Sequence, residues 1–69
     1  MNNGQFLKEI GVKVKSARKA KKITLMELSK SCGIHITQLS FLENGKCNSH
    51  ILTLKSIADV LEMDVKDFI

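Results

Sequence analysis

The chain has 69 residues, enough for one domain with a single small core, so we expect one domain over residues 1–69. No apolar run approaches the roughly 20 residues that span a bilayer, and no secretory signal precedes the first helix, so we expect a cytoplasmic protein with reduced cysteines and no membrane association. The net charge is +4, which favours a polyanionic partner, and the absence of catalytic or phosphate-loop motifs argues against an enzyme or a cofactor.

An amphipathic helix is expected over residues 5–21. Its apolar stripe, at helical spacing, consists of Phe6, Leu7, Ile10, Val14 and Ala17. Six basic residues fall within ten positions near the end of this helix, namely Lys13, Lys15, Arg18, Lys19, Lys21 and Lys22. Residues 1–50 hold nine lysines and arginines against three acids, whereas residues 51–69 hold two against four. The positive charge therefore belongs to the first part of the chain.

Two short amphipathic helices are expected next, over Leu25–Cys32 and Ile36–Glu43. Gly33 stands between them, where a tight turn needs a positive φ. Two helices joined by about four residues that include a glycine indicate a helix-turn-helix, whose second helix can lie in a DNA major groove.

Local signals mark the ends of these two helices. Thr24 and Glu27 have the spacing of a capping box at the first start, and His35 and Gln38 repeat it in a weaker form at the second. The pair NG at residues 44–45 ends the second helix, because both residues tolerate the left-handed conformation.

A fourth helix is expected over residues 51–61. It should bury Ile51, Leu54, Ile57, Ala58 and Leu61. Asp64 then caps a last turn over residues 65–69, in which Phe68 returns to the core. The pattern therefore predicts an all-α chain of five helices and no strands.

The order of these motifs resembles the Cro/C1-type (XRE) helix-turn-helix domain of phage repressors and small bacterial transcription regulators. The resemblance covers residues 10–69 and is carried by LSKSCGI at residues 28–34, LSFLENG at 39–45 and TLKSIADVL at 53–61. It implies a compact five-helix lambda-repressor-like fold and double-stranded DNA as the partner.

The resemblance places the base-contacting residues at the start of the recognition helix. They would be Ile36, Thr37, Gln38, Ser40 and Phe41. Thr37 can donate a hydrogen bond to a base edge or accept one from it, and Gln38 can make a bidentate contact with adenine. Ile36 and Phe41 cannot hydrogen-bond, but they can pack on thymine methyl groups.

The phosphate contacts implied by the resemblance lie on both flanks of that helix. Thr24 and the backbone N–H of Leu25 would hold one phosphate, at a helix N-terminus that favours an anion. Leu25 stands where glutamine is common in the family, so its contact must come from the backbone. Asn44, Lys46 and Asn48 would lie beside the DNA backbone on the other flank.

Two further expectations follow from the resemblance. Arg18 and Glu43 occupy positions that form an ion pair between the first helix and the end of the third. A domain this small reads few base pairs, so we expect a homodimer on a palindromic site. Its surface would involve the fourth helix, the last turn and Phe68 with Ile69, and no small-molecule effector is expected.

Some residues depart from the family pattern. Lys22 and Glu62 replace the glycines that usually follow the first and fourth helices, so these helices should stop less cleanly. Leu25, Ile36 and Phe41 make the presumed DNA face unusually apolar. Exposed apolar clusters often mark protein contacts, so a protein-interaction module that uses the third helix is the alternative function.

Two Cys-x-x-His pairs offer a rival interpretation. Cys32, His35, Cys47 and His50 could together hold tetrahedral zinc. The helix-turn-helix already explains Cys32 as a small core residue and His35 as a cap, so we expect no metal. A disulfide between the two cysteines is less favoured still.

Overall fold

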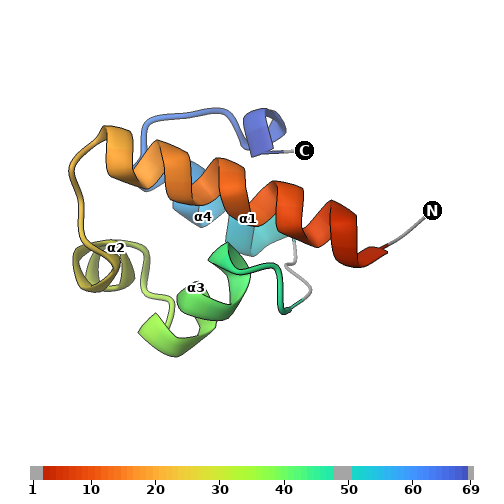
Figure 1. The fold of residues 1–69 in the computed structure, drawn as a ribbon. Coiled ribbons are helices and arrows are strands. Elements are labelled where there is room, and N and C mark those ends of the chain that lie inside the picture. The colour runs from red at the N-terminus through yellow and green to blue at the C-terminus, as the bar shows by residue number, and fades with distance from the viewer. Residues whose placement is uncertain (1–2, 48–50, 69) are drawn as a thin grey trace.

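The structure is a computed structural model that describes residues 3–47 and 51–68. These ranges contain no strand, and their elements are α1 (Asn3–Ala20), α2 (Leu25–Cys32), α3 (Ile36–Glu43), α4 (Ile51–Val60) and the 3-10 turn η1 (Val65–Phe68) (Figure 1). None of the helices in this part of the chain combines the length and apolarity needed to cross a membrane.

The all-α prediction is confirmed, and the bounds of α2 and α3 agree with the sequence to the residue. The expectation of five helices is wrong, because the described residues form four α-helices. The last element, η1, is a four-residue 3-10 turn, which has i to i+3 hydrogen bonds and suits so short a segment.

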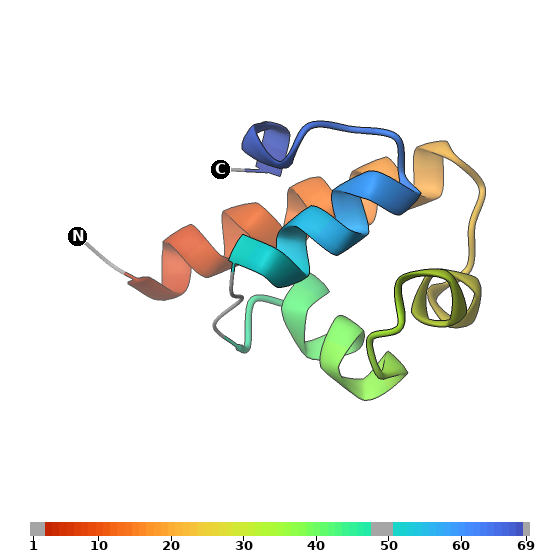
Figure 2. The ribbon, with the colours of Figure 1, turned by 180° about the vertical axis from the view of Figure 1, so that it is seen from behind.

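The helices pack around one core. α1 contacts α3 and η1, while α2 contacts α3 and α4. Figures 1 and 2 show α2 and α3 together on the side of the molecule opposite η1. The core gathers residues from every element: Ile10, Val14, Leu28, Leu39, Leu42, Leu54, Ile57, Ala58, Leu61 and Phe68.

Two predicted core residues lie at the surface instead. Phe6 is 45% exposed and Ile51 is 55% exposed. Phe6 lies near the start of α1, and Ile51 begins α4. The N-terminal end of α1 extends past the other helices (Figure 2). Helical periodicity places each residue on the apolar stripe of its own helix, but near the start of the helix the neighbouring elements cover that stripe only in part.

Gly11 permits a close approach of α1 to the end of α3. A Cβ built on Gly11 would lie 2.5 Å from the carbonyl oxygens of both Leu42 and Glu43. No side chain larger than hydrogen fits there without moving α3. The lack of a side chain at Gly11 therefore allows α3, the candidate recognition helix, to pack directly against α1.

The two non-glycine residues that follow α1 and α4 adopt the left-handed conformation. Lys22 has φ 58° and Glu62 has φ 59°. Behind them, Ile23 N–H donates to the Arg18 carbonyl at 3.3 Å and Met63 N–H donates to the Ala58 carbonyl at 2.8 Å. The helices α1 and α4 therefore end in the conformation that glycine usually adopts, although lysine and glutamate find this conformation unfavourable.

Candidate nucleic-acid interface

The turn between α2 and α3 is built around Gly33. Its φ of 76° is left-handed, and its N–H donates to the Ser29 carbonyl at 3.0 Å. The Ser29 hydroxyl donates to the Ile34 carbonyl at 2.5 Å. The backbone and a side chain of α2 therefore both hold the connection that sets the angle of α3.

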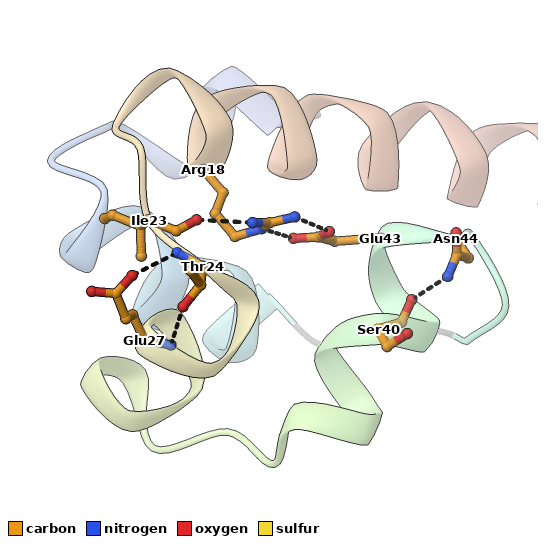
Figure 3. A network of polar contacts seen from close by, with 7 residues as sticks. All are labelled: Arg18, Ile23, Thr24, Glu27, Ser40, Glu43 and Asn44. Atoms are coloured by element: carbon orange, nitrogen blue, oxygen red, sulfur yellow. Dashed lines mark hydrogen bonds and ion pairs between the residues drawn. The ribbon is translucent and has the colours of Figure 1, made fainter.

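A capping box starts α2, as the sequence predicts. The Thr24 hydroxyl accepts from the Glu27 N–H at 3.1 Å, and the Glu27 carboxylate accepts from the Thr24 N–H at 2.9 Å (Figure 3). The Thr24 N–H, and then its hydroxyl, lower the pKa of Glu27 because they stabilise the carboxylate.

His35 starts α3, but not through the predicted box with Gln38. Its Nδ1 accepts from the N–H of Thr37 at 3.1 Å. The imidazole thus caps the N–H of the second helical position. The N-terminus of α3 is fixed by a side chain on the surface.

The candidate base-contacting residues fall into two groups by exposure. Thr37, Gln38 and Phe41 are exposed, whereas Ile36 and Ser40 are half-buried. The opposite face of α3 is buried and consists of Leu39, Leu42 and Glu43. Thr37, Gln38 and Phe41 are therefore the candidate residues that the fold leaves accessible to a partner.

The apolar face predicted from the sequence is smaller in the structure. The side chain of Leu25 is half-buried and packs against the core. Ile36 is half-buried, and Phe41 keeps 49% of its surface exposed. Leu25 is thus largely a structural residue, and Phe41 is the main apolar group on the outer face of α3.

The residues after α3 form its second flank. Asn44 donates through Nδ2 to the Ser40 carbonyl at 2.9 Å (Figure 3), and the Lys46 N–H donates to the Phe41 carbonyl at 2.8 Å. The Lys46 side chain is exposed. Asn48, the remaining candidate, lies outside the described residues.

Arg18 and Glu43 form the ion pair that the resemblance implies. Arg18 Nε donates to Glu43 Oε2 at 2.7 Å, and a terminal nitrogen donates to Oε1 at 3.1 Å. The other terminal nitrogen donates to the Ile23 carbonyl at 2.8 Å (Figure 3). The hydrogen bond to Glu43 raises the pKa of Arg18 above its ordinary value and outweighs the opposing effect of burial.

Lys8 is a candidate phosphate contact that the sequence did not reveal. A Cβ built on Gly45 would lie 2.7 Å from both Cα and Cγ of Lys8. This packing brings Lys8 of α1 beside the segment that carries Asn44 and Lys46. Neither helical periodicity nor motif spacing links these residues, because the contact depends on how α1 crosses α3.

The described residues give no support to the zinc interpretation. No three His, Cys, Asp or Glu side chains within residues 3–47 and 51–68 gather as a metal site. Both thiols are free, and both cysteines pack against the core. His50, the fourth proposed ligand, lies outside the described residues.

Comparison with known proteins agrees with this geometry. The sequence profile of the helix-turn-helix family HTH_3 matches residues 14–68, which include all of the helices from α2 onward. This chain belongs to the HTH_3 family. The Cro/C1-type resemblance stated from the sequence is thereby confirmed.

Solved structures resemble this HTH_3 chain along its length. An HTH_3 family transcriptional regulator from Vibrio cholerae has a TM-score of 0.90 at 27% identity, over 97% of this chain and 38% of its own. The clp gene regulator ClgR from Corynebacterium glutamicum has a TM-score of 0.87 at 28% identity, over 91% of this chain and 67% of its own. The restriction-modification controller protein C.AhdI from Aeromonas hydrophila shares the fold, with a TM-score of 0.94 at 17% identity over 100% of both chains.

A phage protein is also similar in sequence. The ImmF control region 10 kDa protein of Bacillus phage phi105 is 34% identical over 58 residues, which are 84% of this chain. This HTH_3 chain spans 64% of the length of that phage protein and 38% of the Vibrio cholerae regulator.

Proposed function

We propose that this HTH_3 chain is a sequence-specific DNA-binding transcription regulator that acts in the cytoplasm, and not an enzyme. It binds a palindromic operator as a homodimer, with α3 in the major groove. The observation that carries the proposal is the exposed start of α3, where Thr37, Gln38 and Phe41 stand outward on a helix held by the Gly33 turn and by the Arg18–Glu43 pair.

The contacts to the DNA backbone come from both flanks of α3. At the start of α2, the backbone N–H of Leu25 and the first turn of the helix offer donors to one phosphate, with Thr24 beside it. On the other side, Asn44 and Lys46, joined by Asn48 from outside the described residues, meet a second phosphate. Such contacts set the register, while the exposed residues of α3 specify the sequence.

The dimer surface is proposed on α4. Ile51 and Leu52 at its start are 55% and 73% exposed, although both are large apolar residues. Phe68, which the sequence also suggested for this surface, is fully buried in the core of its own chain and offers no side chain to a partner. Two copies joined in this way would present two α3 helices to half-sites one helical turn apart.

Selection from a random library of double-stranded DNA tests the proposal. We expect an enriched inverted repeat whose half-site centres lie about 10 base pairs apart, and a dimer by light scattering at the same protein concentration. An enriched site without two-fold symmetry would contradict the dimer. No enrichment, together with no salt-dependent binding to any duplex, would favour the alternative in which α3 contacts a protein.

A further inference from the structure

The outer face of α3 carries a short exposed line of three residues. Thr37, Phe41 and Asn44 are separated by four and three positions, so they lie on one side of the helix. All three are exposed, while Leu39 and Leu42 on the opposite side are 0% and 2% exposed. Phe41 is therefore at the centre of the surface that α3 presents.

The side chains of α3 limit what this surface can recognise. The sequence of α3, ITQLSFLE, contains no arginine, lysine or asparagine. The commonest specific contact in a major groove, from Arg or Lys to guanine, is therefore not available from this helix. Gln38 can bind adenine, and the one apolar group that a major groove offers to Phe41 is the 5-methyl group of thymine.

Positive charge just beyond the C-terminal end of α3 favours DNA over an apolar protein partner as the occupant of this face. The carbonyl of Phe41 accepts from the N–H of Lys46, so an exposed lysine stands directly after the helix. Lys8 of α1 packs against Gly45 and is exposed as well. An exposed apolar residue on α3, with two exposed lysines near the segment that follows the helix, fits a base edge flanked by phosphates.

We propose that α3 recognises its site through thymine 5-methyl groups, with Phe41 as the main specificity-determining residue. The half-site is then rich in A·T pairs in the stretch that α3 covers, with a thymine facing Phe41 and an adenine within reach of Gln38. This inference rests on the proposed DNA-binding function and names the chemical group that the site recognises.

Deoxyuridine tests the inference, because it replaces thymidine with the loss of the 5-methyl group alone. Each thymidine of the selected operator is replaced in turn, and binding is measured by fluorescence anisotropy at fixed salt. We expect one position per half-site at which the wild-type Kd rises about fourfold, the value for losing burial of one methyl group. In F41A the Kd should be the same for both duplexes at that position.

Two further variants serve as matched controls. V12A truncates an exposed apolar residue on α1, where Val12 is 61% exposed, and should keep the fourfold difference. F41L keeps an apolar side chain and should keep part of the difference in Kd between the thymidine and deoxyuridine duplexes. Far-ultraviolet circular dichroism establishes that all three variants fold, which the 49% exposure of Phe41 leads us to expect.

Two further duplexes distinguish the contribution of the methyl group from that of the rest of the base pair. At the sensitive position, a C·G pair should bind more weakly than T·A, and 5-methylcytosine should recover part of the loss, because it carries its methyl group at the same place. Operator binding that is indifferent to deoxyuridine at every position would overturn this inference and leave the proposed function intact. Failure to bind any duplex would overturn both.

Discussion

Arg18 and Glu43 join the end of α1 to the end of α3 through two hydrogen bonds of 2.7 and 3.1 Å. The same guanidinium donates to the carbonyl of Ile23, just before α2. One side chain therefore connects three segments that are separate in the chain (Figure 3). Both partners are almost excluded from solvent, with side chains 11% and 5% exposed, so the pair fixes the angle at which α3 leaves the scaffold.

Removing one member of this pair should cost more than removing both. R18M leaves the carboxylate of Glu43 buried without its partner and should lower the free energy of unfolding by about 3 kcal/mol. The double variant R18M/E43M should be more stable than R18M, because no unpaired charge remains. Urea unfolding at neutral pH measures both values.

A milder variant keeps this comparison measurable, because the loss in R18M is comparable with the whole stability of a small domain. R18K retains the charge but cannot form the two-pronged contact, so its stability should fall between those of wild type and R18M. If the double variant loses as much free energy of unfolding as R18M and E43M lose together, the two residues act independently.

The left-handed residues Lys22 and Glu62 predict two stabilising substitutions. The left-handed conformation costs a non-glycine residue about 1–2 kcal/mol, and part of this is offset by the larger entropy that glycine loses on folding. K22G should therefore raise the free energy of unfolding by about 0.5–1 kcal/mol. E62G should gain less, because Glu62 also accepts from Lys21 at 3.0 Å in an exposed ion pair.

The control for these substitutions is the same change inside a helix. Lys15 lies in the middle of α1 with an exposed side chain, so K15G should destabilise the protein by about 1 kcal/mol. Thermal and urea unfolding should thus give opposite signs for K15G and K22G. Equal losses in the two variants would mean that the positive φ of Lys22 stores no strain.

The capping box of α2 predicts a pH dependence of stability. The pKa of Glu27 is lowered in the folded protein from its ordinary value of 4.5, so the unfolded chain holds the proton more tightly. The stabilisation is present above about pH 4.5 and is lost as the pH falls through the lower folded pKa. E27Q keeps an acceptor for the N–H of Thr24 and cannot titrate, so its stability should fall less over that range.

Urea unfolding between pH 3 and pH 7 compares the wild type, E27Q and E9Q. E9Q removes an exposed negative charge from α1 and controls for the change in net charge. A parallel decline of stability in wild type and E27Q would contradict the role of the Glu27 carboxylate.

The sequence predicted those parts of the fold that local interactions determine. The caps at Thr24 and His35 and the Gly33 turn act within five residues, and α2 and α3 begin and end where expected. Errors arose where a distant element decides the outcome. Phe6 and Ile51 fit the apolar pattern, but the neighbouring elements cover them only in part and leave them 45% and 55% exposed.

The same division applies to the candidate site. Family position and helical spacing placed Thr37, Gln38 and Phe41 together, and the structure exposes all three. Lys8 was missed, because its position beside Gly45 follows from the crossing of α1 over α3 and not from any spacing in the chain. The partial burial of Leu25 agrees with helical spacing, which puts it on the same side of α2 as Leu28 and Cys32, and not with the expectation of an exposed place on the DNA face.

Variants on α3 and at its edge should separate specificity from affinity. T37A/Q38A should reduce the preference for the operator over random DNA, with little change in the salt dependence of binding. K46A should weaken binding to all sequences and reduce the slope of log K against log salt by about 0.9, the value for one phosphate contact. Equal losses of specificity in both variants would contradict this division of roles.

K8A gives the sharpest form of this test, because the structure alone identifies Lys8. It should reduce the salt slope by about 0.9, as K46A does, and leave the sequence preference unchanged. K66A is the matched control, since it removes the same charge from η1, on the opposite side of the molecule from α3 (Figure 1). Fluorescence anisotropy titrations at several salt concentrations measure the slopes. A K8A slope equal to that of K66A would show that α1 does not reach the DNA backbone.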